Sequence, residues 1–435
     1  MLLAVASTAC VPSRPSSTAR DAETGGPGDA TAADGRASDA LGFADAGGAD
    51  DARADDDASI DAALDAALDA ALDAALDATV DGSASPDAMV LPDAAPVDAQ
   101  LPDGQGWIPL PGTDLASACP YDQDPTFSGV EGCSAIVEDW SGGIADTLRE
   151  RLVVWGGGHN GYYGNELYAL DLRTQSMQRL NDPSPPWADR NECSPVTANG
   201  DAASRHTYDG LAYIAHADKM FVFGGAPACG PGGISNDTWT FDFATMRWES
   251  RDPHNGGTPG ALPGAVADYD AATRLVYLHD TYAFWSYDVG TNTYALLRDH
   301  LNDGNNLDYH LTGRVDPTRR LFVILGNGEF HLIDLAPGST YALQSPTLTG
   351  CDPVLSAIYP GLSYHPGLDR MVAWAGGDTL YLLDVDQRSC TTLTDGNGPG
   401  VQVANGTNGR FRYFPALGVF GLVNQWDQPG FIFRP

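Results

Sequence analysis

From Trp107 to the C-terminus, short runs of apolar and aromatic residues alternate with turns rich in glycine and aspartate. One unit recurs there: an apolar strand, a turn, in five copies a basic residue, and then a second apolar strand. The second strands begin at intervals of 46–68 residues, at Leu152, Met220, Leu275, Leu321, Met371 and Val419. Self-similarity at such intervals indicates a repeated supersecondary unit.

A third strand follows each second strand. In five copies it ends on an acid, at Asp171, Asp242, Asp288, Asp334 and Asp384. A turn and a short fourth strand come next, as in residues 293–297. Four short, evenly spaced strands predict one twisted antiparallel sheet per copy. The chain is therefore predicted to be all-β, with its sheets arranged as the blades of a β-propeller.

The two ends of this region determine the number of blades. The sixth copy has strands one to three and finishes with FIF at residues 431–433, whereas Trp107–Leu110 has the pattern of a fourth strand with no preceding three. An N-terminal strand that completes the last sheet leaves no open edge. The sequence thus predicts six four-stranded antiparallel blades over residues 106–435, closed by the N-terminal strand.

Three copies carry a glycine pair after strand two, at Gly157–Gly158, Gly224–Gly225 and Gly376–Gly377, and the second copy has Trp239 and Trp248 in strands three and four. Glycine lets two backbones approach, and the aromatic rings fill the space between blades. These features resemble the kelch repeats of the galactose oxidase type superfamily. The resemblance implies a kelch-like propeller. The copper ligands of galactose oxidase have no counterpart residue by residue, so oxidase activity is not implied.

The N-terminus, MLLAVASTAC, resembles the end of a bacterial lipoprotein signal segment, in which the cysteine after small residues is lipidated. On this interpretation residues 1–10 are a signal segment and Cys10 carries the lipid. The protein is then exported to the bacterial outer membrane or cell surface, or otherwise to the periplasm or medium. The alternative is a cytoplasmic N-terminus with a chance cysteine. No later run approaches the ~20 apolar residues that a membrane span requires.

Residues 11–105 consist largely of Asp, Ala, Gly, Pro and Ser. Such a segment cannot bury enough apolar surface to offset its chain entropy, which predicts a disordered acidic spacer. The formal net charge of −35 for the whole chain repels phosphate backbones and anionic lipid. We therefore expect no nucleic-acid partner and contact with a membrane only through a lipid on Cys10. We also expect a monomer.

Six of the seven cysteines lie in the predicted propeller, and an even number in an exported protein indicates disulfide bonds. The favoured pairs are Cys119–Cys133 and Cys193–Cys229, whose members lie in loops on one face. Cys351–Cys390 follows only by elimination. Zinc ligation is disfavoured, because the chain has no Cys-x-x-Cys.

The long loops between strands two and three, and the links between blades, all reach one face of the predicted propeller, and a site is expected at the channel mouth on this face. Its candidate residues are His159, Tyr162, Tyr163, Glu166, Arg205, His206, Tyr208, His310, Arg314, Arg410 and Arg412. No cofactor is predicted, although His159, His206 and His310 from separate blades could bind a transition metal. Alternatively, these polar side chains simply line a wet channel.

Two functions remain open. The first is a surface-tethered or secreted binding module that recognises a glycan or a protein through its long-loop face, which has aromatic residues such as Tyr162, Trp187 and Tyr282. The second is a carbohydrate-active enzyme, either metal-dependent or a sugar mutarotase of the kelch type, that uses Glu166 with Arg205 or Arg410. Propellers host both classes, so the fold alone does not choose between them.

Overall fold

The computed structural model describes residues 100–435 except 192, 230–232 and 253–256. The predicted signal segment, Cys10 and nearly all of the predicted spacer lie outside the described residues. The last residues of that spacer, 100–105, pack on the propeller: Leu101 is buried, and the Arg434 guanidinium donates to the Pro102 backbone oxygen at 2.9 Å. The folded part therefore begins before residue 106. The burial of Leu101 stabilises this packing, because it removes apolar surface from water.

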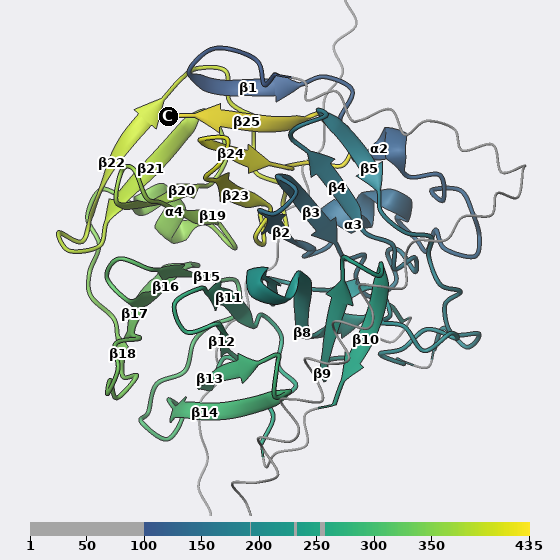
Figure 1. Ribbon diagram of the computed structural model, residues 1–435, viewed down its shortest axis with the longest axis horizontal. Helices are drawn as coiled ribbons and strands as arrows, with labels where there is room; N and C mark the ends of the chain where they lie inside the picture. Colours follow the sequence, from purple (N-terminus) through teal and green to yellow (C-terminus); the bar gives the residue numbers. More distant parts are fainter. Residues whose placement is uncertain (1–99, 192, 230–232, 253–256) are drawn as a thin grey trace, which may run out of the picture. The chain divides into compact units, whose positions relative to one another are not determined.

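Six antiparallel sheets follow one another along the chain and form a ring (Figure 1). Blade one contains β2 (Gly142–Asp146), β3 (Arg151–Trp155), β4 (Tyr168–Asp171) and β5 (Ser176–Arg179). Blade two contains β7 (Leu211–Ile214), β8 (Lys219–Pro227), β9 (Ser235–Asp242) and β10 (Arg247–Arg251). Blade three contains β11 (Val266–Asp270), β12 (Leu275–His279), β13 (Ala283–Asp288) and β14 (Thr293–Asp299).

The second half of the ring repeats this order. Blade four contains β15 (Thr312–Asp316), β16 (Leu321–Gly326), β17 (Glu329–Asp334) and β18 (Leu343–Gln344). Blade five contains β19 (Gly361–His365), β20 (Arg370–Trp374), β21 (Thr379–Asp384) and β22 (Ser389–Thr394). Blade six contains β23 (Phe411–Phe414), β24 (Val419–Leu422), β25 (Gly430–Arg434) and the N-terminal β1 (Gly106–Leu110). The predicted six-bladed all-β fold is thereby confirmed.

The remaining elements are short. Blade two has an extra strand, β6 (Arg205–His206), which pairs with the end of β8. The helices among residues 100–435, outside the gaps given above, are α2 (Leu115–Ala118), α3 (Ala135–Glu138), α4 (Asp352–Ser356) and two 3₁₀ turns, η1 (Gly132–Ser134) and η2 (Ala215–Ala217). Within the described part of the chain, no helix combines the length and apolar character needed to cross a membrane.

Closure of the ring depends on β1, which pairs antiparallel with β25 so that Trp107 lies opposite Phe433. The strand that opens the described chain therefore forms the outer edge of the last blade, next to the C-terminus (Figure 1). The first strands of neighbouring blades also contact one another in an unbroken cycle from β2 to β23 and back to β2. This pairing is the closure that the sequence predicted.

Apolar side chains fill each of the six boundaries between neighbouring blades. In β3, Leu152 and Val154 pack toward blade six, whereas Val153 and Trp155 pack toward blade two. Alternate side chains of a strand point to opposite faces, so a sheet buried on both faces needs an apolar residue at every position. The uninterrupted run LVVW is the direct result.

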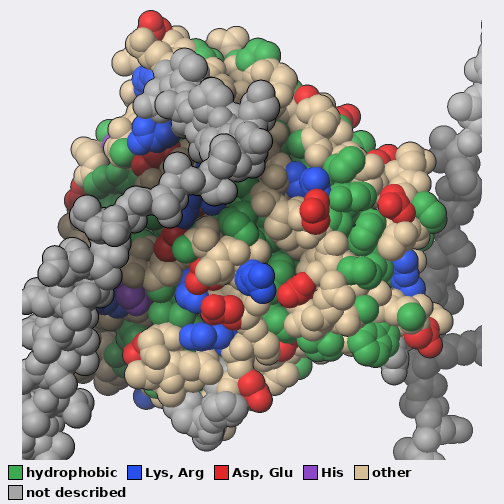
Figure 2. Space-filling view, turned by 45° about the vertical axis from the view of Figure 1, so that its right-hand side comes forward, with side chains coloured by type: hydrophobic (Ala, Val, Ile, Leu, Met, Phe, Trp, Pro, Cys, Tyr) green, Lys and Arg blue, Asp and Glu red, His purple; other side chains and the backbone are tan. Residues whose placement is uncertain are grey.

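Three disulfide bonds join Cys119–Cys133, Cys193–Cys229 and Cys351–Cys390. The sequence favoured the first two pairs and gave the third only by elimination. The first lies in the segment between β1 and β2, and the third ties the start of α4 to β22. On the face drawn in Figure 2, acidic and basic side chains are interspersed. Ion pairs such as Arg149 with Asp218, at 2.6 Å, connect neighbouring blades.

Trp107 should contribute strongly to closure. Its ring is 2% exposed and packs edge-on against Trp374 and Phe433, with centroids 6.1 and 5.2 Å away. Trp107→Ala should lower the free energy of unfolding by about 3–5 kcal/mol, because a buried cavity remains. The control Leu296→Ala, at a position 52% exposed on β14, should change it by less than about 0.5 kcal/mol. Denaturant titration of both variants measures this, and equal effects would contradict the role of β1.

Candidate functional site

The link that enters each first strand contains a residue with a left-handed backbone. We name this set the entry ring: Trp140, Tyr208, Gly264, His310, Tyr359 and Asn408, with φ between 42° and 97°. Five of the six are not glycine, and such a conformation costs a non-glycine residue roughly 1–3 kcal/mol. The turns between strands one and two, on the opposite face, have the same backbone conformation, for example at Glu150 and Asp218. The entry ring is the candidate site because it lies on the long-loop face.

Backbone hydrogen bonds between blades hold the entry ring in place. The Tyr208 N–H donates to the Trp140 carbonyl at 2.8 Å, and the Tyr359 N–H donates to the His310 carbonyl at 2.8 Å. The Gly143 N–H donates to the Asn408 carbonyl at 3.1 Å, which links blade one to blade six. These bonds couple the entry ring between blades one and two, four and five, and six and one.

The four aromatic side chains of the entry ring form a connected set of rings together with His206 and Tyr309. Tyr208 of blade two stacks on Tyr359 of blade five, with centroids 6.0 Å apart and planes at 29°. His206 lies 4.8 Å from Trp140 and 5.9 Å from Tyr208. On the other side His310 lies 5.3 Å from Tyr359 and 3.8 Å from Tyr309. Aromatic rings from four blades therefore meet on the long-loop face. We call these side chains, with His159, the aromatic mouth.

Two glycines make room for this packing. A Cβ on Gly158 would lie 2.1 Å from the His206 imidazole, and Gly158 has a φ of +65°. A Cβ on Gly264 would lie 2.4 Å from the Tyr309 Cβ, and Gly264 has a φ of +78°. Only glycine satisfies both the backbone angle and the close approach. His159, which follows Gly158 directly, contacts His206, with ring centroids 4.3 Å apart.

Four buried polar atoms of the aromatic mouth and entry ring have no hydrogen-bond partner among the described residues. They are Trp140 Nε1, His159 Nδ1, Tyr359 Oη and Asn408 Oδ1. Tyr359 is fully buried and Asn408 is 1% exposed. Buried polar groups are nearly always hydrogen-bonded, and leaving one without a partner costs about 1–3 kcal/mol. These atoms include a donor, an acceptor and a hydroxyl that can do both, so they are suited to a polar ligand.

The histidines of the mouth are neutral near physiological pH. Burial, and then the charge of His159, lowers the pKa of His206 to about 3. Its Nε2 accepts a hydrogen bond from the His159 backbone N–H at 3.1 Å, so the proton sits on Nδ1. Burial also lowers the pKa of His159 and of His310. The imidazoles therefore contribute uncharged aromatic surface.

The loop that carries Tyr309 is attached to blade three through two histidines. The His279 and His300 rings share a hydrogen bond of 2.8 Å, and His300 Nε2 donates to the Tyr341 carbonyl at 2.8 Å. His279 Nδ1 accepts from the Thr281 N–H, so every ring nitrogen is used when both imidazoles are neutral. This series of hydrogen bonds holds the segment 300–309, which ends at Tyr309, against blade three.

The four predicted arginines lie near the first strands, but other parts of the protein engage their guanidinium groups. Arg314 forms a buried bidentate pair with Asp209, with both bonds at 2.7 Å, and Arg205 pairs with Asp237 at 2.7 Å. Arg410 donates to four backbone oxygens, those of Ser141, Gly406, Val423 and Asn424. The arginines therefore tie blades together and leave few donors for a ligand.

Arg412 belongs to the same framework. It donates to the Gly409 carbonyl at 3.0 Å and to the Gly143 carbonyl at 3.3 Å. Tyr163 is also used internally: the Arg190 guanidinium lies 4.0 Å from its ring centroid. Both side chains are buried, and Arg412 also pairs with Asp268 of blade three at 3.4 Å.

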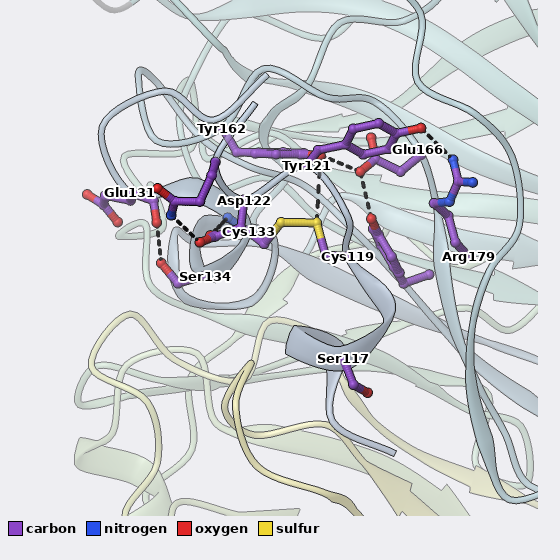
Figure 3. The surroundings of a disulfide bond; sticks show 12 residues. Ser117, Cys119, Tyr121, Asp122, Glu131, Cys133, Ser134, Tyr162, Glu166 and Arg179 are labelled. Carbon is purple, nitrogen blue, oxygen red and sulfur yellow. Dashed lines mark hydrogen bonds between the residues drawn. A yellow bond between two sulfur atoms is a disulfide. The ribbon is translucent and has the colours of Figure 1, made fainter. Parts of the chain in front are cut away.

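Glu166 lies apart from the entry ring, contrary to its predicted direction toward the channel. Its Oε1 accepts hydrogen bonds from Tyr162 at 2.5 Å and Tyr168 at 2.7 Å, beside the Cys119–Cys133 disulfide (Figure 3). Burial raises the pKa of Glu166. The two tyrosines belong to the apolar cluster between blades six and one. Glu166 therefore supports that boundary and is separated from the arginines proposed as its catalytic partners.

The metal-binding hypothesis receives no geometric support. His159 and His206 contact one another, but His310 packs on Tyr309 and Tyr359, and Glu166 is held elsewhere. Across the described residues, no group of three or more His, Cys, Asp or Glu side chains could hold a metal ion. The three imidazole rings pack against neighbouring rings.

Sequence reasoning missed Trp140, Tyr309, Tyr359 and Asn408. A signal was present, because an aromatic residue stands two positions before a glycine at 140–142, 208–210 and 359–361. Each of these triplets opens a first strand. The left-handed backbone is not visible in sequence, because it results from bonds between blades.

The chain has only distant similarity to known proteins. No protein-family model and no curated protein matches it. It is similar to a structural genomics protein of unknown function from Bacteroides thetaiotaomicron VPI-5482, with 11% sequence identity and a TM-score of 0.47, over 76% of this chain and 75% of that chain. Function must therefore be argued from the site.

Asp139, next to Trp140, should make stability depend on pH. Its side chain is buried, and burial, followed by the charge of Glu131, raises its pKa to about 8. The folded protein then holds a proton that the unfolded chain releases above about pH 4, so stability falls as the pH rises toward 8 and then levels. Asp139→Asn imitates the protonated acid. Its stability relative to wild type should rise by up to about 1.4 kcal/mol per pH unit between pH 5 and 8.

Urea titrations of both proteins from pH 5 to 9 measure this difference. A constant difference across the range would show that Asp139 is ionised in the folded protein.

Proposed function

We propose that the protein is a binding module that recognises a neutral glycan at the aromatic mouth. The observation that carries this proposal is the set of buried polar atoms without partners, above all Tyr359 Oη, whose ring stacks on Tyr208, and Asn408 Oδ1 of the entry ring. A ligand that supplies hydroxyl groups would satisfy these atoms. The strain of the entry ring is consistent with a site built before the ligand arrives.

The chemistry of the mouth favours a sugar over a charged ligand. Sugar rings present apolar C–H faces, which suit the faces of Tyr and Trp rings, and hydroxyl groups that both donate and accept. The nearby histidines are neutral, and Arg314 and Arg410 are occupied by Asp209 and by backbone oxygens. An anionic ligand would find no free guanidinium from these arginines. A neutral glycan fits the remaining donors and acceptors.

Display at the cell surface is part of the same proposal. A lipid on Cys10 and the acidic segment that follows would hold the module away from a membrane. Three disulfide bonds are consistent with an oxidising compartment outside the cytoplasm. The kelch-type origin of the repeats also remains a proposal, supported by the left-handed glycine pair Gly224–Gly225 at the register shift within β8, the second strand of blade two.

The Tyr359 hydroxyl provides a direct test. Tyr359→Phe keeps the ring and removes the unpartnered oxygen, and it should weaken glycan binding about 2- to 10-fold while leaving the fold intact. The control is Tyr381→Phe, which removes a hydroxyl from β21, an outer strand of blade five. An array of neutral and sulfated oligosaccharides would identify a ligand for calorimetric titration of both variants. Binding confined to sulfated sugars, or equal affinity of both variants, would reject the proposal.

A further inference from the structure

A second group of polar side chains lies on the outer part of blade four, where the Glu329 carboxylate also accepts from the Asp308 backbone N–H at 3.5 Å, beside the loop that carries Tyr309. Glu329 and His331 alternate on β17 and therefore point to the same face. The register that pairs Leu332 with Gln344 and Ile333 with Leu343 places Ser345 opposite His331. Three side chains from two adjoining segments thus meet on one surface of the sheet.

Their hydrogen bonds form a Ser–His–Glu chain. His331 Nε2 lies 2.7 Å from Glu329 Oε2, and His331 Nδ1 lies 2.8 Å from Ser345 Oγ. A carboxylate only accepts, so Nε2 carries the proton of a neutral ring and Nδ1 accepts from the serine hydroxyl. The serine is therefore bonded to a base, and the base is oriented by a carboxylate. This is the general arrangement of an activated nucleophile, whatever the fold.

The three residues differ in exposure in the way that this chemistry needs. Ser345 is exposed to solvent, His331 is 8% exposed, and the Glu329 side chain is 30% exposed. An open cavity of about 430 Å³ adjoins them, with the apolar side chains of Phe330, Leu348 and Leu355 along it. A substrate can thus approach the hydroxyl while an apolar group is buried beside it.

We propose that Ser345 is a nucleophile for small carboxylic esters, with His331 as its general base and Glu329 as the residue that positions His331. This proposal does not rest on glycan binding, because Ser345 and His331, which carry the chemistry, take no part in the aromatic mouth. Thr347 lines the same cavity and can supply a hydroxyl and a backbone N–H to the substrate oxygen. The apolar side chains suit a short acyl group.

The reaction balances without a cofactor. Ser345 Oγ bonds to the ester carbonyl carbon as its proton moves to His331 Nδ1, and the carbonyl π electrons move to oxygen. When the tetrahedral intermediate collapses, the bond to the leaving alkoxide breaks and that oxygen takes the proton from Nδ1. Water then attacks the acyl-serine by the same route, which releases the carboxylic acid and restores the serine.

The test uses the full chain, a fluorophosphonate and p-nitrophenyl acetate. In the wild-type protein the fluorophosphonate should label Ser345. Mass spectrometry of the labelled peptide would identify the modified residue. Ser345→Ala should lose the label and the esterase activity, and His331→Gln should lower both rates at least about 100-fold, the usual contribution of a general base. Ser250→Ala is the matched control, since Ser250 is an exposed serine on the outer strand β10.

Glu329→Gln separates positioning from folding. It should lower kcat about tenfold with KM and melting temperature unchanged, because a carboxylate that orients the base acts in the chemical step. Labelling of Ser345 no faster than that of Ser250, or labelling that survives His331→Gln, would overturn the proposal. In that event the three side chains would only join β17 to the segment after β18, and the variants would change the melting temperature alone.

Discussion

The pairing of β1 with β25 is the constraint on which the rest of this structure depends. Each blade is a sheet that buries both faces against its neighbours, so no blade is complete without the two boundaries beside it. The boundary between blades six and one can form only when the first strand of the folded region joins the last sheet of the chain. An open ring would expose the edge of β25 and the apolar faces on either side of the gap.

Closure also explains where the buried charges lie. Arg314 from blade four reaches Asp209 at the start of blade two, and Arg410 from blade six reaches the Ser141 carbonyl at the start of blade one. Burial lowers the pKa of Arg410 to about 9, yet its guanidinium is surrounded by backbone oxygens. Removing such groups from water is costly unless every donor finds an acceptor. These arginines therefore act as ties between blades, which is a structural use of polar residues near the axis.

Closure of the ring also positions the entry ring. The function proposed for it rests on the buried polar atoms that closure leaves without hydrogen-bond partners. Inter-blade bonds force Tyr208, His310 and Tyr359 into left-handed conformations, and their rings then meet over the first strands. The unpartnered Tyr359 and Asn408 oxygens are the part of this arrangement that packing alone does not explain. The group formed by Glu329, His331 and Ser345 has a more local origin, because the register of the neighbouring strands β17 and β18 brings His331 and Ser345 together. The proposed glycan site would thus be made by the whole ring, and the proposed esterase site by a single blade.

The sequence by itself determined the architecture of this protein. Apolar runs such as LVVW, repeated at propeller spacing, define sheets buried on both faces, and the unpaired strands at the two ends define six blades and their closure. The candidate site was predicted only in part: His159, His206, Tyr208 and His310 do meet on the long-loop face, whereas Glu166 and the four arginines serve the framework. Only the tertiary structure could decide this, because a side chain's role depends on which partners other blades bring within hydrogen-bonding distance. Strand patterns are local and are encoded in alternating residues, but the partners of Arg314, Glu166 and Tyr359 are set by ring closure between residues far apart in the chain.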